Sequence, residues 1–154
     1  LYAGLMIKDG AAKVVEFNCR FGDPETQVVL ALMESDLLEL INACADGTLA
    51  DKKVSWSKNS AVCVILASGG YPKAYKKNLP IDGIAKAKTL GAMIFHAGTK
   101  ILNGELVTNG GRVLGVTMIA PTLKEAVDKV YKCVEVIYFD DMHYRRDIAA
   151  KALK

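Results

Sequence analysis

The chain has 154 residues, of which 51% are hydrophobic and 24% charged, and this composition excludes a disordered protein and a collagen-like fibre. Its 20 Lys and Arg against 17 Asp and Glu give a net charge of +3, too small to indicate nucleic acid as a partner. No apolar run approaches the roughly 20 residues that span a bilayer, and no signal-peptide pattern is visible. The sequence therefore predicts a cytoplasmic protein with no nucleic-acid and no membrane partner.

The first predicted element is a β-hairpin. Residues 2 to 7 and 13 to 19 are apolar-rich runs joined by Lys8-Asp9-Gly10, and Asp-Gly between such runs is a strong hairpin signal. Leu1 to Ile7 already reads as a strand and carries no initiator Met. This beginning suggests that the chain is a piece of a longer protein.

Two helices are expected after the hairpin. Asp23-Pro24-Glu25 has the pattern of a helix start, with a side-chain cap, a proline at the first helical position and an acid in the first turn. Ser35 is the predicted cap of a second helix, which Gly47 ends. The polar stretch from about 51 to 59 is then the predicted boundary between a first part, 1–58, and a second part, 59–154.

The second part is expected to be a small, largely antiparallel sheet closed by a helix. Its predicted helix runs from Thr122 to Ile137, with Thr122 and Glu125 forming a capping box. Five short β-rich runs precede this helix, separated by Gly-Gly and Asn-Gly turns: 61–67, 92–96, 100–102, 105–108 and 113–119. The predicted fold class of the whole chain is α+β.

The most informative chemistry lies on the second hairpin strand. Alternate residues of a strand share a face, so Glu16, Asn18 and Arg20 point one way, while Val15, Phe17 and Cys19 are expected to point into the core. Glu16 and Asn18 stand roughly 7 Å apart at the backbone, so their side-chain oxygens can converge on one hard cation such as Mg²⁺. The adjacent guanidinium can clamp a carboxylate or a phosphate.

Simpler interpretations of the same residues remain open. Glu16 and Arg20 could form a cross-strand surface ion pair with Asn18 incidental, a contact worth less than about 1 kcal/mol. Asp23 and Glu25 have an ordinary explanation as an N-cap and a first-turn acid. The glycine pairs at 69–70 and 110–111 are explained by tight turns, although Lys73 and Arg112 could contact phosphate there.

The residues of this strand and those that follow it resemble a known family. Glu16-Phe17-Asn18-Cys19-Arg20-Phe21-Gly22-Asp23-Pro24-Glu25 is similar to the signature of phosphoribosylamine glycine ligases, also called glycinamide ribonucleotide synthetases, of the ATP-grasp superfamily. Further matching runs follow in order, the main ones at 67–72, 95–99, 110–117 and 144–148. The resemblance implies that 1–58 is the C-terminal end of an ATP-grasp domain and that 59–154 is the family's C-terminal domain.

The resemblance also implies a reaction and its partners. Such ligases use ATP to phosphorylate glycine, and the amine of 5-phosphoribosylamine then attacks the acyl phosphate. Glu16 and Asn18 would hold Mg²⁺ (or Mn²⁺), Arg20 would be catalytic and bind substrate, and Asp23 and Glu25 would bind substrate. The family's N-terminal and lid domains are not part of these residues, so the chain alone is expected to be inactive.

Two other functions were weighed against this one. A non-catalytic module could keep the signature as inherited scaffold, and an ATP-grasp ligase could act on another acid, as biotin-dependent carboxylases do. The Arg20-to-Glu25 continuation of the signature argues against the second of these functions.

Overall fold

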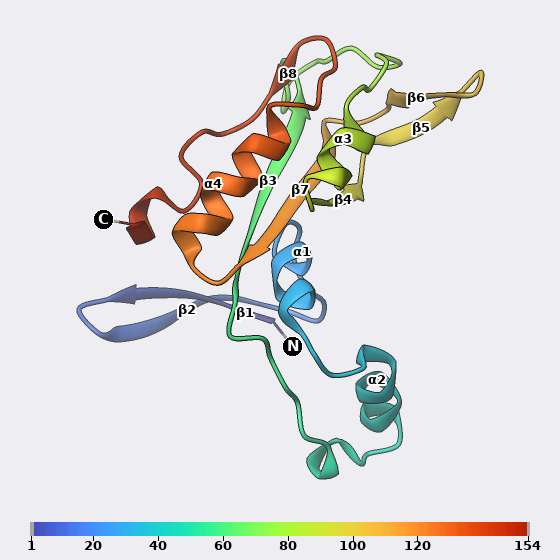
Figure 1. Cartoon of the computed structure of the whole chain (residues 1–154). Helices are drawn as coiled ribbons and strands as arrows, with labels where there is room; N and C mark the ends of the chain where they lie inside the picture. The colour runs from blue at the N-terminus through green and yellow to red at the C-terminus, as the bar shows by residue number, and fades with distance from the viewer. Residues whose placement is uncertain (1, 154) are drawn as a thin grey trace.

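The computed structural model describes residues 2–153 and has an α+β fold (Figure 1). Leu1 and Lys154, which the two predicted parts include, lie outside the described residues. The chain forms a long hairpin and short helices first, and then a sheet with one helix packed against it. The predicted fold class and the order of the predicted elements are confirmed.

The opening hairpin has the expected turn. Its strands are β1 (Tyr2–Lys8) and β2 (Ala11–Asn18), paired antiparallel. Asp9 and Gly10 both have positive φ, 51° and 77°, as a two-residue turn with the twist of a hairpin requires. This local signal was sufficient to place the hairpin.

Short helices follow the hairpin, and their starts differ from the prediction. Asp36, not Ser35, caps the second helix by accepting hydrogen bonds from the backbone N–H groups of Leu38 and Glu39. The Ser35 hydroxyl is instead engaged by the N–H of Ser55. The elements are α1 (Thr26–Val29), the 3₁₀ turn η1 (Leu30–Leu32), α2 (Leu37–Ala45), which ends before Gly47, and η2 (Leu49–Asp51).

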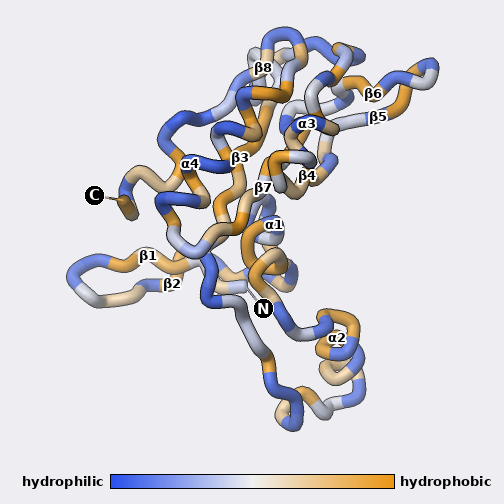
Figure 2. Tube along the Cα trace, viewed as in Figure 1, coloured by the Kyte–Doolittle hydropathy of each residue, from blue (hydrophilic) through white to orange (hydrophobic). Residues whose placement is uncertain are grey.

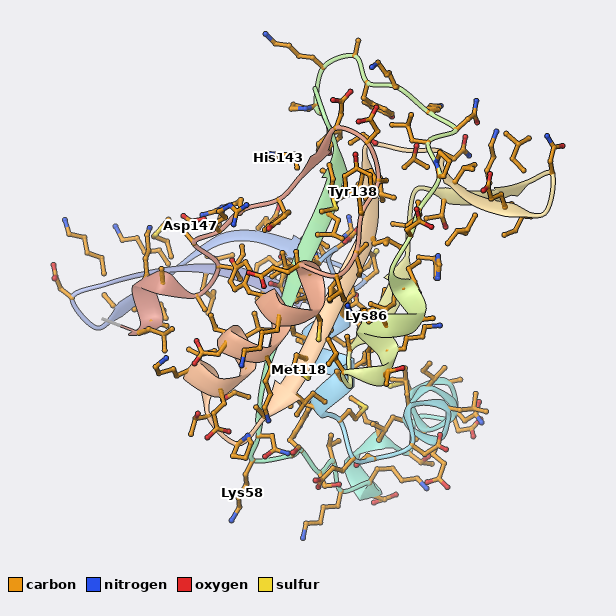
Figure 3. All side chains as sticks on the ribbon, turned by 45° about the horizontal axis from the view of Figure 1, so that its top comes forward. Lys58, Lys86, Met118, Tyr138, His143 and Asp147 are labelled. Atoms are coloured by element: carbon orange, nitrogen blue, oxygen red, sulfur yellow. The ribbon has the colours of Figure 1, made fainter. Side chains whose placement is uncertain are left out.

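The remainder is a four-stranded antiparallel sheet with spatial order β4-β7-β3-β8 and a separate hairpin, β5–β6. Lys58, just before β3, and His143, in β8, lie at opposite ends of this sheet (Figure 3). The strands are β3 (Ser60–Ser68), β4 (Met93–His96), β5 (Thr99–Leu102), β6 (Glu105–Thr108), β7 (Arg112–Ala120) and β8 (Met142–His143). All five predicted β-rich runs are strands.

One helix covers the sheet and completes the core. The strand β3 is hydrophobic along its length (Figure 2), and its Val64 and Leu66 are fully buried together with Val130 and Val134 of α4 (Leu123–Val134). The predicted helix extended to Ile137, but α4 ends three residues earlier. The structure adds elements that the sequence analysis did not predict: α3 (Ile84–Thr89), β8 and the final 3₁₀ turn η3 (Ala150–Leu153).

The prediction that Val15, Phe17 and Cys19 point into a core is wrong for this chain. Val15 is 65% exposed and Phe17 62% exposed, and Cys19 is exposed as well. The reason is geometric: a two-stranded ribbon buries a face only if another layer packs on it, and within residues 2–153 no layer covers this one. Alternation identifies two faces, but it does not supply the layer that buries one of them.

The cap of α4 gives a test of the fold. Thr122 accepts a hydrogen bond from the backbone N–H of Glu125 through its hydroxyl, at 3.2 Å. We expect Thr122→Ala to lower the free energy of unfolding by about 1 kcal/mol, because one N–H at the helix start loses its acceptor. Urea denaturation measures this loss. Thr122→Ser keeps the hydroxyl and should lose much less, and equal losses for the two variants would contradict the capping role.

Candidate functional site

A cavity of about 500 Å³ opens between the end of β2, the turn that precedes α1 and the start of β7. Most of its lining comes from the segment that carries the predicted site, but Tyr2 comes from β1 and Arg112 from the start of β7. The lining residues are Tyr2, Glu16, Asn18, Arg20, Phe21, Gly22, Asp23, Glu25, Thr26 and Arg112. All five predicted site residues therefore line one cavity.

Glu16 and Asn18 lie on the same face of β2, as the strand period predicted. The Asn18 side-chain amide donates a hydrogen bond to Glu16 Oε1 at 3.2 Å, so the two side chains converge. Gly4, the cross-strand partner of Glu16, leaves room for this arrangement, because a Cβ there would lie 3.1 Å from Glu16 Cγ. Neither side chain is sealed in an apolar interior, since both line the cavity.

This pair fits a hard divalent cation. Two neighbouring ligands of octahedral Mg²⁺, each about 2.1 Å from the ion, lie about 3.0 Å apart. The observed separation of 3.2 Å between Glu16 Oε1 and the Asn18 amide matches that value, and a half-turn of the amide presents its oxygen in place of its nitrogen. Two protein ligands would leave the other positions of an octahedral ion to water and phosphate.

Arg20 was expected on the same strand face, but β2 ends at Asn18, and Arg20 lines the cavity from the bend that follows. Its Nη1 donates a hydrogen bond to the backbone carbonyl oxygen of Phe21 at 3.2 Å. This contact orients the guanidinium toward the next residue of the chain. The ion pairs of the described residues do not include a Glu16–Arg20 pair, so the simpler surface-pair interpretation is not observed. The remaining N–H donors of Arg20 stay available to an anion in the cavity.

Asp23 is not the helix cap that the sequence suggested. The helix α1 begins at Thr26, its N-cap residue is Glu25, and no side chain caps it. The carboxylate of Asp23 is held elsewhere: Oδ1 accepts from Gln27 Nε2 at 3.1 Å, and Oδ2 lies 3.3 Å from Arg112 Nη2. The predicted helix start at Asp23-Pro24-Glu25 is therefore wrong in its cap, because Gln27 and the distant Arg112, and not the helix N–H groups, bind the carboxylate.

Glu25 is held by the same turn. Its carboxylate lies against Gly22, where an added Cβ would have to displace the end of this flexible side chain. The Thr26 hydroxyl and backbone N–H both donate to the Gly22 carbonyl oxygen, at 2.7 and 3.1 Å. Because α1 has only four residues, its start contributes little of the positive field expected from a helix N-terminus.

Arg112 is the lining residue that the sequence analysis did not assign. The sequence suggested Arg112 only as a possible phosphate contact at the Gly110-Gly111 turn, yet its Nη1 donates to the backbone carbonyl oxygen of Asp23 at 2.9 Å. The two residues are 89 positions apart, and no local pattern connects them. Lys73, noted beside the other glycine pair, does not line the cavity.

The other reactive groups lie outside the cavity. The four cysteines are free, Cys63 and Cys133 buried and Cys19 and Cys44 exposed. Burial raises the pKa of the Cys63 thiol, which makes it a poor nucleophile near neutral pH. His96 Nδ1 lies 3.2 Å from the Thr99 hydroxyl, a local structural contact.

Comparisons with known proteins agree on one family. The model of the phosphoribosylglycinamide synthetase C domain matches residues 61–151, and that of the ATP-grasp (A) domain of the same synthetase matches residues 1–26. The chain is 49% identical over 155 residues to a phosphoribosylamine–glycine ligase from Synechocystis, covering 99% of this chain and 37% of that protein. It is 46% identical to the human trifunctional purine biosynthetic protein adenosine-3, with 99% and 15% covered.

A solved structure shows the same likeness in three dimensions. The crystal structure of a phosphoribosylamine–glycine ligase from Thermotoga maritima superposes with a TM-score of 0.75 at 38% identity, covering 94% of this chain and 35% of that one. The chain thus spans only about a third of the length of the single-enzyme relatives it matches. Over residues 2–153, no helix is long and apolar enough to cross a membrane.

Proposed function

Because the chain belongs to the phosphoribosylglycinamide synthetase family, we propose that it forms the C-terminal part of an ATP-dependent ligase that joins glycine to 5-phosphoribosylamine. The product is glycinamide ribonucleotide, and the route passes through a glycyl phosphate. The observation that carries this proposal is the convergence of Glu16, Asn18, Arg20, Asp23 and Glu25 on one polar cavity. Such a cavity offers a metal site, a cation and two carboxylates to a reaction that transfers a phosphoryl group to an acid.

In this proposal Glu16 and Asn18 hold Mg²⁺ or Mn²⁺. The ion, when bound, neutralises charge on the phosphates of ATP and of the transferring phosphoryl group. Glu16 supplies the charged oxygen ligand, and Asn18 supplies a neutral one. With only two protein ligands the ion keeps positions for phosphate oxygens, which is the usual protein environment of Mg²⁺ beside a nucleotide.

Arg20 acts on the acid that is being activated. Its guanidinium carries a fixed positive charge, which favours both binding of the glycine carboxylate and the charge that develops as a phosphoryl group reaches it. Asp23 and Glu25 line the same cavity and contribute two carboxylates to it. These carboxylates suit the amine end of a substrate, either the ammonium of glycine or the amine that attacks the acyl phosphate.

The remaining binding surfaces belong to other parts of the proposed enzyme. The relatives are about three times longer than this chain, so the adenine clamp and most of the phosphoribosylamine site are expected in their other domains. We propose that 1–58 completes an ATP-grasp domain, that 59–154 is a separate C-terminal domain, and that the enzyme works in the cytoplasm. The 154 residues alone are expected to be inactive.

The test is an assay of the full-length protein that contains this chain. We expect ADP release that requires glycine, 5-phosphoribosylamine and Mg²⁺ together, and glycinamide ribonucleotide as the product by mass spectrometry. Alanine, acetate and bicarbonate replace glycine in parallel reactions. Turnover with one of these acids but not with glycine would indicate another ATP-grasp ligase, and the absence of Mg²⁺-dependent nucleotide binding would indicate a non-catalytic module.

A further inference from the structure

Arg112 reaches the proposed site from the second part of the chain. It is the first residue of β7, and it lines the same cavity as the five residues of the signature segment. Apart from the local hydrogen bond between Ser57 and Asn59 at the boundary, its two contacts with Asp23 are the hydrogen bonds and ion pairs of the described residues that connect 1–58 with 59–154. The residue therefore links the sheet to the turn that carries the cavity's carboxylates.

The guanidinium holds Asp23 at two points. Nη1 donates to the backbone carbonyl oxygen at 2.9 Å, and Nη2 lies 3.3 Å from Oδ2 of the carboxylate. Because Arg112 contacts both the main chain and the side chain of Asp23, it restrains the backbone and the χ1 angle of Asp23 together. A single ion pair would not do this. Both side chains are 43% exposed, so the pair contributes little to folding stability and another role is needed to explain its geometry.

Gln27 restrains the same carboxylate from the opposite side. Its Nε2 donates to Asp23 Oδ1 at 3.1 Å, while its Oε1 is buried and accepts no hydrogen bond from residues 2–153. Turning the amide over would place an oxygen against the carboxylate, so the contact with Asp23 determines its orientation.

The start of β7, which carries Arg112, is held by its own contacts. Its carbonyl oxygen accepts from the N–H of Gly98 at 2.8 Å, and the preceding Gly111 is bonded through its carbonyl oxygen to the N–H of Ser68, also at 2.8 Å. Gly111 lies against the ring of Tyr71, where no Cβ would fit, and this close packing fixes the turn before β7. The guanidinium is thus presented from a well-held strand end and not from a free loop.

The carboxylate retains capacity for a ligand in spite of these contacts. An ionised carboxylate has about four acceptor sites, and one donor on each oxygen leaves about two of them. Asp23 lines the cavity, so these sites face the space that the substrates would occupy. A positively charged amine is the ligand that such a pre-oriented carboxylate binds best.

We infer that Arg112 is a positioning residue of the ligase: it fixes Asp23 so that its carboxylate meets the amine group of a substrate. This inference rests on the proposed function for the identity of the substrates. It assigns no direct contact between Arg112 and the reacting atoms. It makes the end of β7 part of the machinery that orients the site.

The test uses Arg112→Ala, Asp23→Ala and the double variant in the full-length protein, with Arg146→Ala as a control outside the cavity. We expect Arg112→Ala to raise the KM for glycine or 5-phosphoribosylamine at least about tenfold while the KM for ATP changes little, because a misplaced binding group affects only its own ligand. Adding Arg112→Ala to Asp23→Ala should cost nothing further. Arg112→Lys should recover part of the loss, because it keeps one charged donor.

Hydrogen exchange gives a second result that does not depend on activity. Arg112→Ala should speed amide exchange in residues 22–29 and leave β3 and β7 unchanged, because the turn loses its anchor. An equal loss of kcat/KM with and without Asp23, or a lowered Tm with unchanged kinetics and unchanged exchange at 22–29, would overturn the inference. If the wild-type protein does not ligate glycine, the proposed function fails, and the exchange result alone then decides the role of Arg112.

Discussion

Replacing Arg20 by alanine in the full-length protein is expected to lower turnover by at least about 100-fold, the usual cost of losing one charge-stabilising group. Arg20 lines the cavity beside Glu16 and Asn18, and its contact with the Phe21 carbonyl oxygen directs it along the site without using its full set of donors. The proposed reaction moves a phosphoryl group onto a carboxylate, and both carry negative charge. Without the guanidinium of Arg20, the negative charge of the phosphoryl group and the carboxylate would lose one of its stabilising cations.

The measurement is steady-state ADP release with glycine and 5-phosphoribosylamine. Lys13→Ala is a matched control, since it removes another exposed cation from β2 that does not line the cavity. Arg20→Lys should fall between the wild type and Arg20→Ala, because an ammonium keeps the charge and loses the planar fork. Turnover of Arg20→Ala within a few-fold of the Lys13→Ala value would contradict a catalytic role for Arg20.

Where a feature depends on residues close together in the chain, the sequence was sufficient. The Asp9-Gly10 turn, the Thr122 cap and the shared face of Glu16 and Asn18 all follow from short-range rules, and each is present in the structure. The five β-rich runs of the second part followed from turn signals in the same way, whereas their spatial order in the sheet was not predicted. Local geometry leaves few alternatives over two to four residues, and this is why these predictions held.

Features that depend on distant residues were missed or wrong. No pattern near Asp23 indicates that Arg112 will take its carboxylate from the end of another strand, 89 residues away. The same limit explains Val15 and Phe17, whose alternation marked a face without showing what would cover it. Tertiary contacts decide both cases, and a single sequence carries no direct record of them.

The exposed apolar side chains of the β1–β2 hairpin indicate a surface that another part of the full-length protein would cover. Leu5, Met6 and Ile7 of β1 are exposed together with Val15 and Phe17 of β2, so apolar side chains cover both strands of one ribbon. The single-enzyme relatives are about three times longer than this chain. In the full-length protein such a ribbon is expected to pack against a further layer, which would hold Glu16 and Asn18 in place at its inner end.

Glu16→Gln in the full-length protein tests the proposed metal site, and turnover is expected to fall by at least about 100-fold at saturating substrates. The substitution keeps the size of the side chain and its hydrogen bond with Asn18, but it removes the negative charge that a hard cation prefers. The loss should therefore appear in the metal dependence. We expect the Mg²⁺ concentration for half-maximal rate to rise at least about tenfold, as loss of one charged ligand weakens a site built from two side chains.

The measurement is a titration of Mg²⁺, and then of Mn²⁺, at fixed ATP and glycine. Glu39→Gln provides the matched control, because that carboxylate lies in the first turn of α2 and does not line the cavity. Mn²⁺ should recover more activity than Mg²⁺ in Glu16→Gln, since it binds nitrogen and neutral oxygen ligands more readily. A Glu16→Gln enzyme with slowed turnover but an unchanged metal titration would assign Glu16 to substrate orientation, and unchanged turnover would exclude the pair on β2 as the metal site.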